Sequence, residues 1–370
     1  MPTRHPRQPF SLAAMIGFAL VLGLVAPSAA LPSANALPTA TGVGRTLVVA
    51  PWGSDYDTDG HSTFTPSASR PWATLTMAIR RAKPGDTIVL RGGTYREVAG
   101  WGARPARPDA RITVEPWPGE RAVLKGVLQL DGADYWTLRG LTIVADPQRS
   151  RGQFVVKFDG GTGWELLDSE VTGSTGVSNV MVTSDRFGPP ADYRIAGNCI
   201  HGNRSTGRAR MNYHNIYLMP GPAAGPGVIE RNLVFDAPNG SNIKAAGPSP
   251  ARPTGNVVIR YNTLATASAG ISLAYGSNRI STYRNLIGPS GRGDLPFDAA
   301  VRGNHVNGVG NVVRQTAVWK YRNTVKSTDD SSRPIRARGV VRLNPGFDRV
   351  GTCSGYRPTA RAAQAYGRYA

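Results

Sequence analysis

Three segments, "YRIAGNCI" (193–200), "GVIERNLV" (227–234) and "VVIRYNTL" (257–264), share one pattern that decides the fold. Each joins a short apolar run to an asparagine. Four more segments align with them: "WTLRGLTI" (136–143), "WELLDSEV" (164–171), "STYRNLI" (281–287) and "NGVGNVV" (307–313). The shared column holds Leu141, Ser169, Asn198, Asn232, Asn262, Asn285 and Asn311, at steps of 23 to 34 residues.

A period of this length, in short strands between Gly, Asn and Pro turns, is typical of a solenoid whose repeats bury their faces against their neighbours. Leucine-rich repeats share the period, but the chain lacks their dense leucine framework. Strand alternation and the many Gly and Asn residues exclude helical repeats. The sequence therefore predicts an all-β parallel β-helix, in which the repeated asparagines stack at a corner and serve the structure rather than a ligand.

The N-terminal part follows another pattern. "TLVVAPWGSDYDTDG" (46–60) predicts a strand and a polar loop, and "TIVLRGGTYRE" (87–97) predicts a second strand. Between them, Leu75, Ala78, Ile79 and Ala82 have helical spacing before a Pro-Gly stop. We expect a helix near residues 72–82 to cap the open end of the first coil. Residues 45–350 then form one domain with its cap, the chain packs irregularly after about residue 315, and residues 351–370 form a C-terminal tail.

The first thirty residues predict the compartment. A basic start leads into the apolar run "SLAAMIGFALVLGLVA" (11–26), and small residues follow, as in a secretory signal peptide spanning 1–30 with cleavage after residue 30 or 36. An uncleaved signal anchor is the alternative. No later run approaches the roughly 20 apolar residues of a membrane span. We therefore expect a secreted, extracellular protein without a membrane span, and a monomer.

The net charge of +19 favours a polyanionic partner, because positive potential concentrates negative ligands. Export favours an acidic polysaccharide over nucleic acid. A surface made basic only for solubility is the alternative. The chain has two cysteines, Cys199 and Cys353, which outside the cell either pair or stay as buried free thiols. Two cysteines without a histidine at ligand spacing argue against zinc.

"VVAPWGSD" (48–55) and "RPWATLTMAIRRAKPGDTIVLRGGTYRE" (70–97), with the later coils, resemble secreted right-handed parallel β-helix proteins of the pectate-lyase-like superfamily. The resemblance implies a right-handed solenoid across roughly residues 45–350. The superfamily includes lyases of pectate, alginate and chondroitin-type chains as well as uronate epimerases, so the resemblance alone does not select an activity. Its lyases use a Lys, Arg or His base and often a calcium ion. The Asp-Pro-His-Asp type of motif associated with alginate epimerases is absent.

Four strands, "HNIYL" (214–218), "SNIKA" (241–245), "GISLA" (270–274) and "AVRGN" (300–304), can be aligned with Ile216, Ile243, Ile271 and Val301 pointing inward. Alternation with period two then places the flanking residues outside. One outward column contains Met181, Tyr217, Lys244, Ser272 and Arg302. The other begins with Asn179, Asn215 and Asn242.

These columns can line a groove for an acidic sugar chain. β-Elimination requires a base, a cation for the uronate carboxylate and a proton donor. We predict a catalytic group with Lys244 as the base, its pKa lowered by Arg260 or Arg302, and Tyr217 or His214 as the donor. Arg260 or Arg231 binds the carboxylate. The predicted substrate-binding residues are Arg231, Arg302, Asn215 and Asn242. The alternatives are a solvated surface lysine and a histidine bonded to a turn carbonyl.

No metal is predicted for this group. "DYDTDG" (55–60) suggests calcium, but the twelfth position of an EF-hand loop would be Pro66, so that motif fails. Calcium in this loop stays an open alternative, and the central carboxylates are scattered. The sequence thus predicts a polysaccharide lyase acting on uronate-containing chains. The alternative is a non-catalytic glycan or cell-surface binding protein, and a glycoside hydrolase ranks last because no acid pair stands out.

Overall fold

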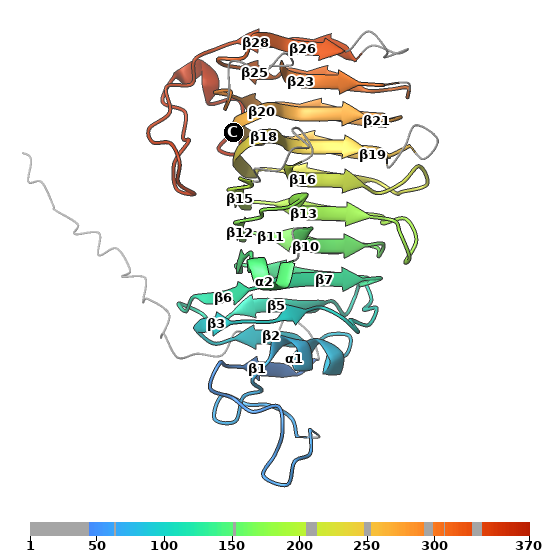
Figure 1. Cartoon of the computed structure of the whole chain (residues 1–370), viewed down its shortest axis with the longest axis vertical. Coiled ribbons are helices and arrows are strands. Elements are labelled where there is room, and N and C mark those ends of the chain that lie inside the picture. The colour runs from blue at the N-terminus through green and yellow to red at the C-terminus, as the bar shows by residue number, and fades with distance from the viewer. Residues whose placement is uncertain are drawn as a thin grey trace, which may run out of the picture. The chain divides into compact units, whose positions relative to one another are not determined.

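The computed structural model describes residues 44–62, 64–150, 153–204, 213–247, 253–291, 299–306, 308–327 and 335–370. The predicted signal peptide and both cleavage positions lie outside these ranges, so secretion stays a prediction. Within the described part, the chain is nearly all β and forms a parallel solenoid, which confirms the predicted fold class (Figure 1). No helix among these residues is long and apolar enough to cross a membrane.

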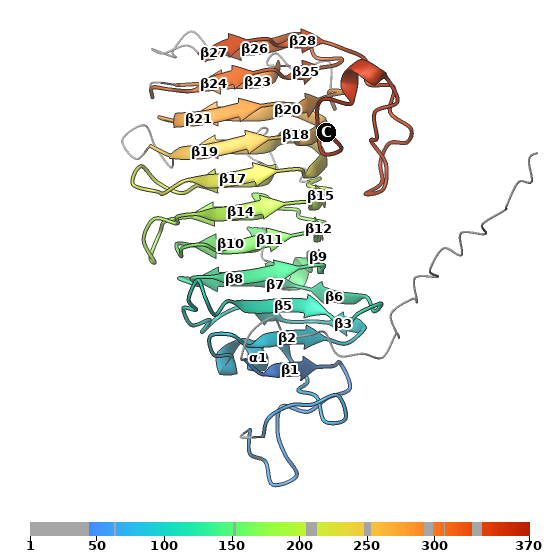
Figure 2. The same ribbon diagram turned by 180° about the vertical axis from the view of Figure 1, so that it is seen from behind.

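Sheet A has eleven strands, one from each successive coil, and every neighbouring pair is parallel (Figure 2). Its strands in spatial order are β1 (Thr46–Val49), β2 (Thr87–Leu90), β5 (Ile112–Pro116), β8 (Trp136–Arg139), β11 (Glu165–Leu167), β14 (Tyr193–Ala196), β17 (Gly227–Glu230), β19 (Gly255–Arg260), β21 (Asn278–Tyr283), β24 (Val312–Arg314) and β27 (Arg336–Arg338).

Sheet B has seventeen strands and two limbs, so each full coil contributes to it twice. Limb 1 contains β3 (Gly93–Tyr95), β6 (Ala122–Lys125), β9 (Thr142–Val144), β12 (Glu170–Thr172), β15 (Cys199–His201), β22 (Leu286–Ile287), β25 (Ala317–Val318) and β28 (Val341–Arg342). Limb 2 contains β4 (Val98–Ala99), β7 (Val127–Asp131), β10 (Phe154–Asp159), β13 (Ser178–Thr183), β16 (His214–Met219), β23 (Ala299–Asn304) and β26 (Asn323–Ser327). The long strands β18 (Leu233–Ala246) and β20 (Thr263–Ala274) run through both limbs.

The core lies between the sheets, where inward side chains from successive coils stack. The predicted inward column of Ile216, Ile243, Ile271 and Val301 is in register and fully buried. Because each coil touches only the coils before and after it, such columns provide the apolar contact that stabilises a solenoid. This register also determines which residues lie on the outer face of limb 2.

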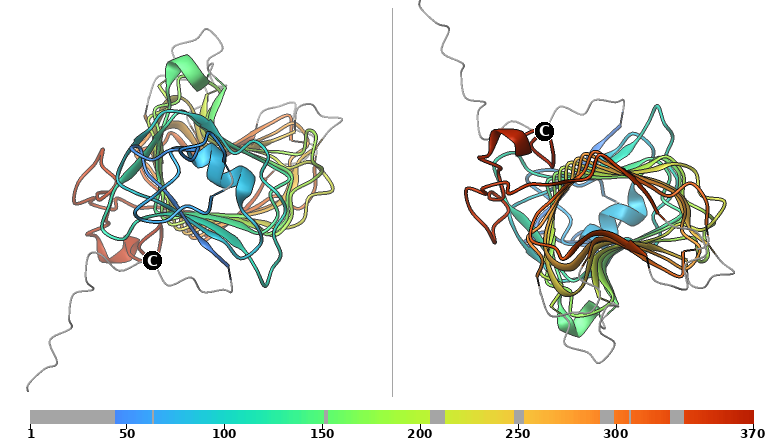
Figure 3. Two further views of the ribbon diagram at one scale, coloured as in Figure 1. Left: turned by 90° about the horizontal axis from the view of Figure 1, so that it is seen from below. Right: turned by 90° about the horizontal axis from the view of Figure 1, so that it is seen from above.

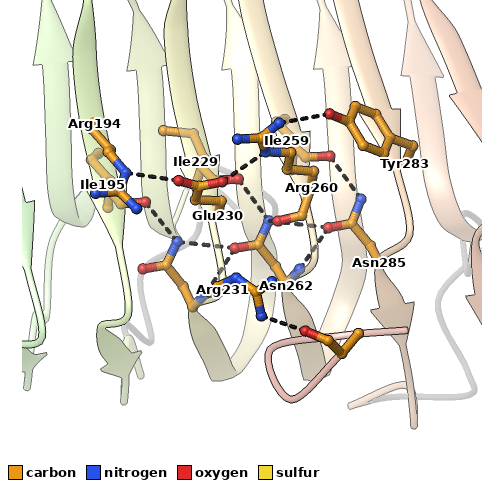
Figure 4. A network of polar contacts seen from close by, with 12 residues as sticks. Arg194, Ile195, Ile229, Glu230, Arg231, Ile259, Arg260, Asn262, Tyr283 and Asn285 are labelled. Atoms are coloured by element: carbon orange, nitrogen blue, oxygen red, sulfur yellow. Dashed lines mark hydrogen bonds and ion pairs between the residues drawn. The ribbon is translucent and has the colours of Figure 1, made fainter. Parts of the chain in front are cut away.

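The repeated asparagines form a buried ladder, as the sequence predicted. The side-chain amides of Asn198, Asn232 and Asn262 each donate to the carbonyl oxygen of the next asparagine, at 2.9 to 3.0 Å. Figure 4 shows Asn262 and Asn285 at the end of this ladder. One assignment was wrong: Asn311 bonds to the backbone at Ile280 and Ser277, and the residue in register after Asn285 is Thr316. The unequal lengths of the last repeats hid this shift.

The predicted helix is present as α1 (Leu75–Arg81), and the Oγ1 of Thr74 caps its N-terminus by accepting from the backbone N–H of Met77 at 3.1 Å. Leu75, Ala78 and Ile79 are buried and pack towards β1, β2 and β4. Viewed along the solenoid, α1 lies within the outline of the strands (Figure 3). Its role as a cap stays a prediction. The described residues also contain two short helices, α2 (Pro147–Ser150) and the 3-10 turn η1 (Arg361–Ala363).

The C-terminal part extends the solenoid further than expected. Strands β25 to β28 continue both sheets to Arg342, so the predicted irregular packing after about residue 315 was wrong. The remaining segment turns back along the solenoid, where the backbone N–H of Arg368 donates to Thr263 at 3.1 Å. A disulfide joins Cys353 to Cys199 across 154 residues of sequence, which settles the alternatives left open above.

Candidate functional site

The outer face of limb 2 carries the column that the sequence predicted. Met181 pairs with Tyr217, Tyr217 with Lys244, Lys244 with Ser272 and Ser272 with Arg302, each across neighbouring parallel strands. Adjacent strands lie about 4.8 Å apart, so the backbones of Lys244 and Arg302, two strands apart, are separated by roughly 10 Å. Periodicity alone thus placed Tyr217, Lys244 and Arg302 on one face.

Lys244 is far more buried than an ordinary surface lysine, because only 8% of it is exposed. Its Nζ lies 5.0 Å from the ring centre of Tyr217 and 6.0 Å from that of Tyr275, which are cation–π distances. No hydrogen bond or ion pair joins Lys244 to another described residue. Burial, and then repulsion from Arg302, lower the pKa of Lys244 from 10.5 to about 8.

Two neighbours of Lys244 differ in charge at neutral pH: Tyr217 is neutral and Arg302 is positive. Burial, with a smaller contribution from Tyr275, raises the pKa of Tyr217, so this phenol keeps its proton at neutral pH. Burial lowers the pKa of Arg302, but a guanidinium remains charged in proteins. The column therefore places a lysine that titrates near pH 8 between a neutral phenol and a cation.

His214 lies behind this column rather than on it. It is 1% exposed, and its Nδ1 accepts the backbone N–H of Ser241 at 3.1 Å. Burial, then the charges of Lys244 and Arg302, hold the pKa of His214 well below its usual value, so the ring is neutral. The ring stands edge-on to Tyr217, with the ring centres 5.3 Å apart. The inward parity expected for His214 is confirmed, and its role as a proton donor stays a prediction that this burial disfavours.

The second predicted outward column is wrong. Asn179, Asn215 and Asn242 have no exposed surface and form a second ladder, with amide-to-carbonyl distances of 2.8 and 3.0 Å. Asn215 and Asn242 also donate to the backbone carbonyls of limb 1. The reason is the bend between the two limbs, which turns these side chains inward and leaves Asn215 and Asn242 no surface for a substrate.

Arg231 and Arg260 also lie away from Lys244, because both belong to the side of sheet A. Arg260 donates from Nε to Glu230 at 2.7 Å and from a terminal nitrogen to Tyr283 at 2.9 Å (Figure 4). Arg231 donates to the backbone oxygen of Ala370 and lies over the ring of Tyr261, 5.1 Å from its centre. The predicted grouping of these arginines with Lys244 was wrong, since strand spacing along the chain does not reveal which sheet a strand joins.

The sequence reasoning missed Tyr275, which completes the aromatic surroundings of Lys244. It follows β20 directly, has a positive φ of 45°, and stacks on His305 with the ring centres 5.6 Å apart. The sequence did contain a signal for this residue: in "SLAYG" (272–276) an aromatic residue stands between the strand and a glycine, where a turn is expected. The turn brings the ring back towards Lys244.

Two groups of described residues combine metal-ligand side chains. In the loop proposed for calcium, Asp55 accepts three hydrogen bonds from Ala73 and Thr74, and Asp57 accepts backbone N–H groups of Asp59 and His61. These contacts are those of a stabilised turn. His201 comes close to Cys199 and Cys353, with the potential ligand atoms within 4.8 Å of one another. Both sulfurs are in the disulfide, so they are not free to bind a metal.

Comparison with known proteins supports the fold. No protein-family model and no curated protein sequence match the chain. An alginate lyase from Paenibacillus sp. str. FPU-7 has a similar structure, with a TM-score of 0.53 and 16% identity over 81% of this chain and 95% of that chain. The cedar pollen allergen jun a 1 gives a TM-score of 0.47 with 11% identity, over 88% and 89% of the two chains. Pectate lyase Pel9A gives a TM-score of 0.42 with 14% identity, over 81% of each chain.

Identities this low show a shared architecture and leave activity open. The chain therefore has a parallel β-helix fold similar to that of the alginate lyase, as the resemblance in its sequence implied. Any conclusion about chemistry depends on the column of limb 2.

Proposed function

We propose that the chain is a secreted, polysaccharide-active protein that cleaves uronate-containing chains by β-elimination. The observation that carries the proposal is Lys244, which is 8% exposed on the outer face of limb 2 and whose pKa of about 8 lies near neutral pH. A general base is most effective when its pKa lies near the working pH, because it is then both unprotonated and basic. The disulfide between Cys199 and Cys353 supports an oxidising, extracellular setting.

Lys244 takes the proton from the carbon that bears the uronate carboxylate. The electron pair of that C–H bond forms a carbon–carbon double bond, and the neighbouring carbon–oxygen bond of the glycosidic linkage breaks. Tyr217, kept protonated by its burial, donates its proton to the leaving oxygen. The tyrosinate then regains a proton from the lysinium through water, which restores both groups and closes the proton balance.

Arg302 serves the carboxylate in this scheme. As the proton leaves, negative charge spreads onto the carboxylate oxygens, and a fixed cation two strands from Lys244 stabilises that charge. The same cation lowers the pKa of Lys244, so one residue assists both base and substrate. The overall charge of +19 favours the approach of acidic chains. The similarity in fold to an alginate lyase is consistent with this chemistry.

A non-catalytic glycan-binding protein is the second candidate. The observation in its favour is the pair of tyrosine rings around Lys244, an arrangement that also suits a fixed cation within a binding groove. In this case the column binds uronates but releases no product.

The test is a screen of the purified protein on pectate, alginate and glycosaminoglycans for the ultraviolet absorbance of the unsaturated product. Lys244→Met removes the amine while keeping the length of the side chain. Lys326→Met is the matched control, because Lys326 is an exposed lysine on the same column, next to Arg302. We expect product from the parent and from Lys326→Met but not from Lys244→Met. Product from none of the substrates, with saturable binding to one, would establish the binding protein instead.

A further inference from the structure

A hollow on sheet B lies apart from the Lys244 column. Its volume is about 510 Å³, within the range of about 300–1,000 Å³ that is usual for small-molecule sites. It lies beside β4, β7 and β10 and extends to α2. Figure 1 shows β7, β10 and α2 near one another. Its lining residues are Val98, Trp101, Val127, Gln129, Gln148, Arg149, Gln153 and Phe154. We name it the Trp101 hollow.

The lining combines exposed aromatic surface with amides. Trp101 is 56% exposed, which is unusual for the largest apolar side chain, and Val98 beside it is exposed as well. Gln148 and Gln153 supply both hydrogen-bond donors and acceptors, whereas the amide nitrogen of Gln129 already donates to Asp131 at 3.0 Å. Apolar surface with a few polar groups is the usual composition of a small-ligand site. A pyranose ring has the matching chemistry, with an apolar C–H face and a rim of hydroxyl groups.

Electrostatics distinguishes this hollow from the Lys244 column. Among its described lining residues, Arg149 is the formally charged one, and Asp146 neutralises it through an ion pair of 2.8 Å. These described lining residues offer a carboxylate no unpaired cation. In the Lys244 column, in contrast, no hydrogen bond or ion pair joins Lys244 to another described residue. The Trp101 hollow therefore suits an uncharged ring, and the column suits an acidic one.

The two regions are continuous along limb 2. Gln129 in the hollow pairs with Lys157, Lys157 with Met181, Met181 with Tyr217 and Tyr217 with Lys244. Four strand steps of about 4.8 Å separate Gln129 from Lys244 by roughly 19 Å. One extended polysaccharide running along the solenoid can therefore reach both regions on the same face.

We propose that the Trp101 hollow binds an uncharged pyranose unit of the same polysaccharide whose uronate units occupy the Lys244 column. The substrate class is accordingly a mixed chain, with neutral and acidic sugars, rather than a uniform polyuronate. This inference rests on the proposed function for one point, that the Lys244 column binds uronate units. The chemistry of the hollow itself depends on Trp101, the glutamines and the neutralised Arg149.

The first test measures binding by isothermal titration calorimetry with cellotetraose, mannotetraose and xylotetraose as uncharged probes. We expect saturable binding of at least one probe, weakened about tenfold or more by Trp101→Ala and less by Trp101→Phe, which keeps an aromatic ring. Trp52→Ala is the matched control, because Trp52 is 62% exposed and is not part of the hollow. Its affinity should stay within twofold of the parent. Absence of binding by all three probes, or parent affinity in Trp101→Ala, overturns the proposal.

The second test separates this inference from the proposed function. Lys244→Met should bind the neutral tetrasaccharide with parent affinity, because that residue lies about four strands away. On a long substrate, Trp101→Ala should raise KM about tenfold and leave kcat within twofold, whereas Lys244→Met should abolish kcat. Neutral binding that depends on Trp101, without any elimination product, upholds the hollow and refutes the lyase. Elimination that depends on Lys244, with no effect of Trp101→Ala on KM, refutes the hollow and upholds the lyase.

Discussion

On sheet A, Arg194, Arg260 and Tyr283 gather around the carboxylate of Glu230, whereas on sheet B Lys244 lies beside Tyr217 and Arg302 with no described carboxylate paired to it. Glu230 accepts from Arg194 and from Arg260, each at 2.7 Å (Figure 4). Although burial opposes its ionisation, these hydrogen bonds hold the pKa of Glu230 below its usual value. No carboxylate among the described residues offsets the burial of Lys244, so the pKa of Lys244 falls.

The comparison shows that residue type does not decide whether an outward cation is structural or reactive. Both clusters contain cations and a tyrosine at strand spacing. A shared carboxylate pairs with Arg194 and Arg260 on sheet A and fixes them in place. Without one, the buried lysine of sheet B loses its preference for the charged form and becomes a base near neutral pH.

The largest expected effect is on turnover. Replacing Lys244 with methionine should lower kcat by about 100-fold or more, as is typical for loss of a general base. In the parent, the rate should rise with pH through about 8 and then level off, because the base acts in its unprotonated form. A pH profile of initial rates checks this. A flat profile between pH 6 and 9 contradicts the role of Lys244.

Lys244→Met should also stabilise the fold. Lowering the pKa from 10.5 to about 8 corresponds to roughly 3 kcal/mol of unfavourable burial of the charged amine. Below pH 8 both the folded and unfolded states are protonated, so the variant should gain this full amount. Between pH 8 and 10.5 the unfolded parent binds more protons than the folded one, parent stability rises, and the advantage should disappear. Urea denaturation at pH 7 and pH 10 measures it, and equal differences at both pH values contradict the argument.

Glu230→Gln should act in the opposite direction and destabilise the fold by about 2 kcal/mol at pH 7. The amide is nearly isosteric, but the variant loses the charge that pairs with Arg194 and Arg260, and hydrogen bonds to charged groups are worth about 1.5–3 kcal/mol each before exposure of the arginines weakens them. Because the pKa of Glu230 is lowered, its contribution is present above the usual carboxyl pKa and is lost as the pH falls through the lowered value. Glu165→Gln is the matched control and should cost less, because the Glu165 side chain is 25% exposed in its pair with Arg111, whereas that of Glu230 is 8% exposed.

The smallest effect compares the two tyrosines. Tyr283→Phe removes an acceptor from Arg260 and should destabilise the fold by about 1 kcal/mol. Tyr217→Phe should change stability by less than about 0.5 kcal/mol, because no hydrogen bond joins its hydroxyl to another described residue, but it should slow turnover. Thermal melts give the stability of each variant, and initial rates give its turnover. A large loss of stability in Tyr217→Phe would assign that tyrosine to the structure.

Much of the fold was predictable because a solenoid repeats local rules. Each coil presents the same alternation to the coil before it, so the inward column of Ile216 and Ile243, and the outward pair of Tyr217 and Lys244, followed from aligned strands. Asn311 was misplaced where the last repeats changed length. Asn215 and Asn242 were misplaced because alternation assumes a straight strand, whereas β18 bends from limb 1 into limb 2.

The sequence by itself therefore determined the all-β solenoid, its asparagine ladder and the order of residues along the Lys244 column, since all three depend on spacing within and between neighbouring repeats. Only the tertiary structure decided that Arg260 faces Glu230 on sheet A, that Asn215 lies inside, and that Lys244 is buried between two tyrosines. Burial and charge pairing depend on which strands share a sheet and where a strand bends. Those are properties of the closed coil, and they convert an outward lysine into one with a pKa of about 8.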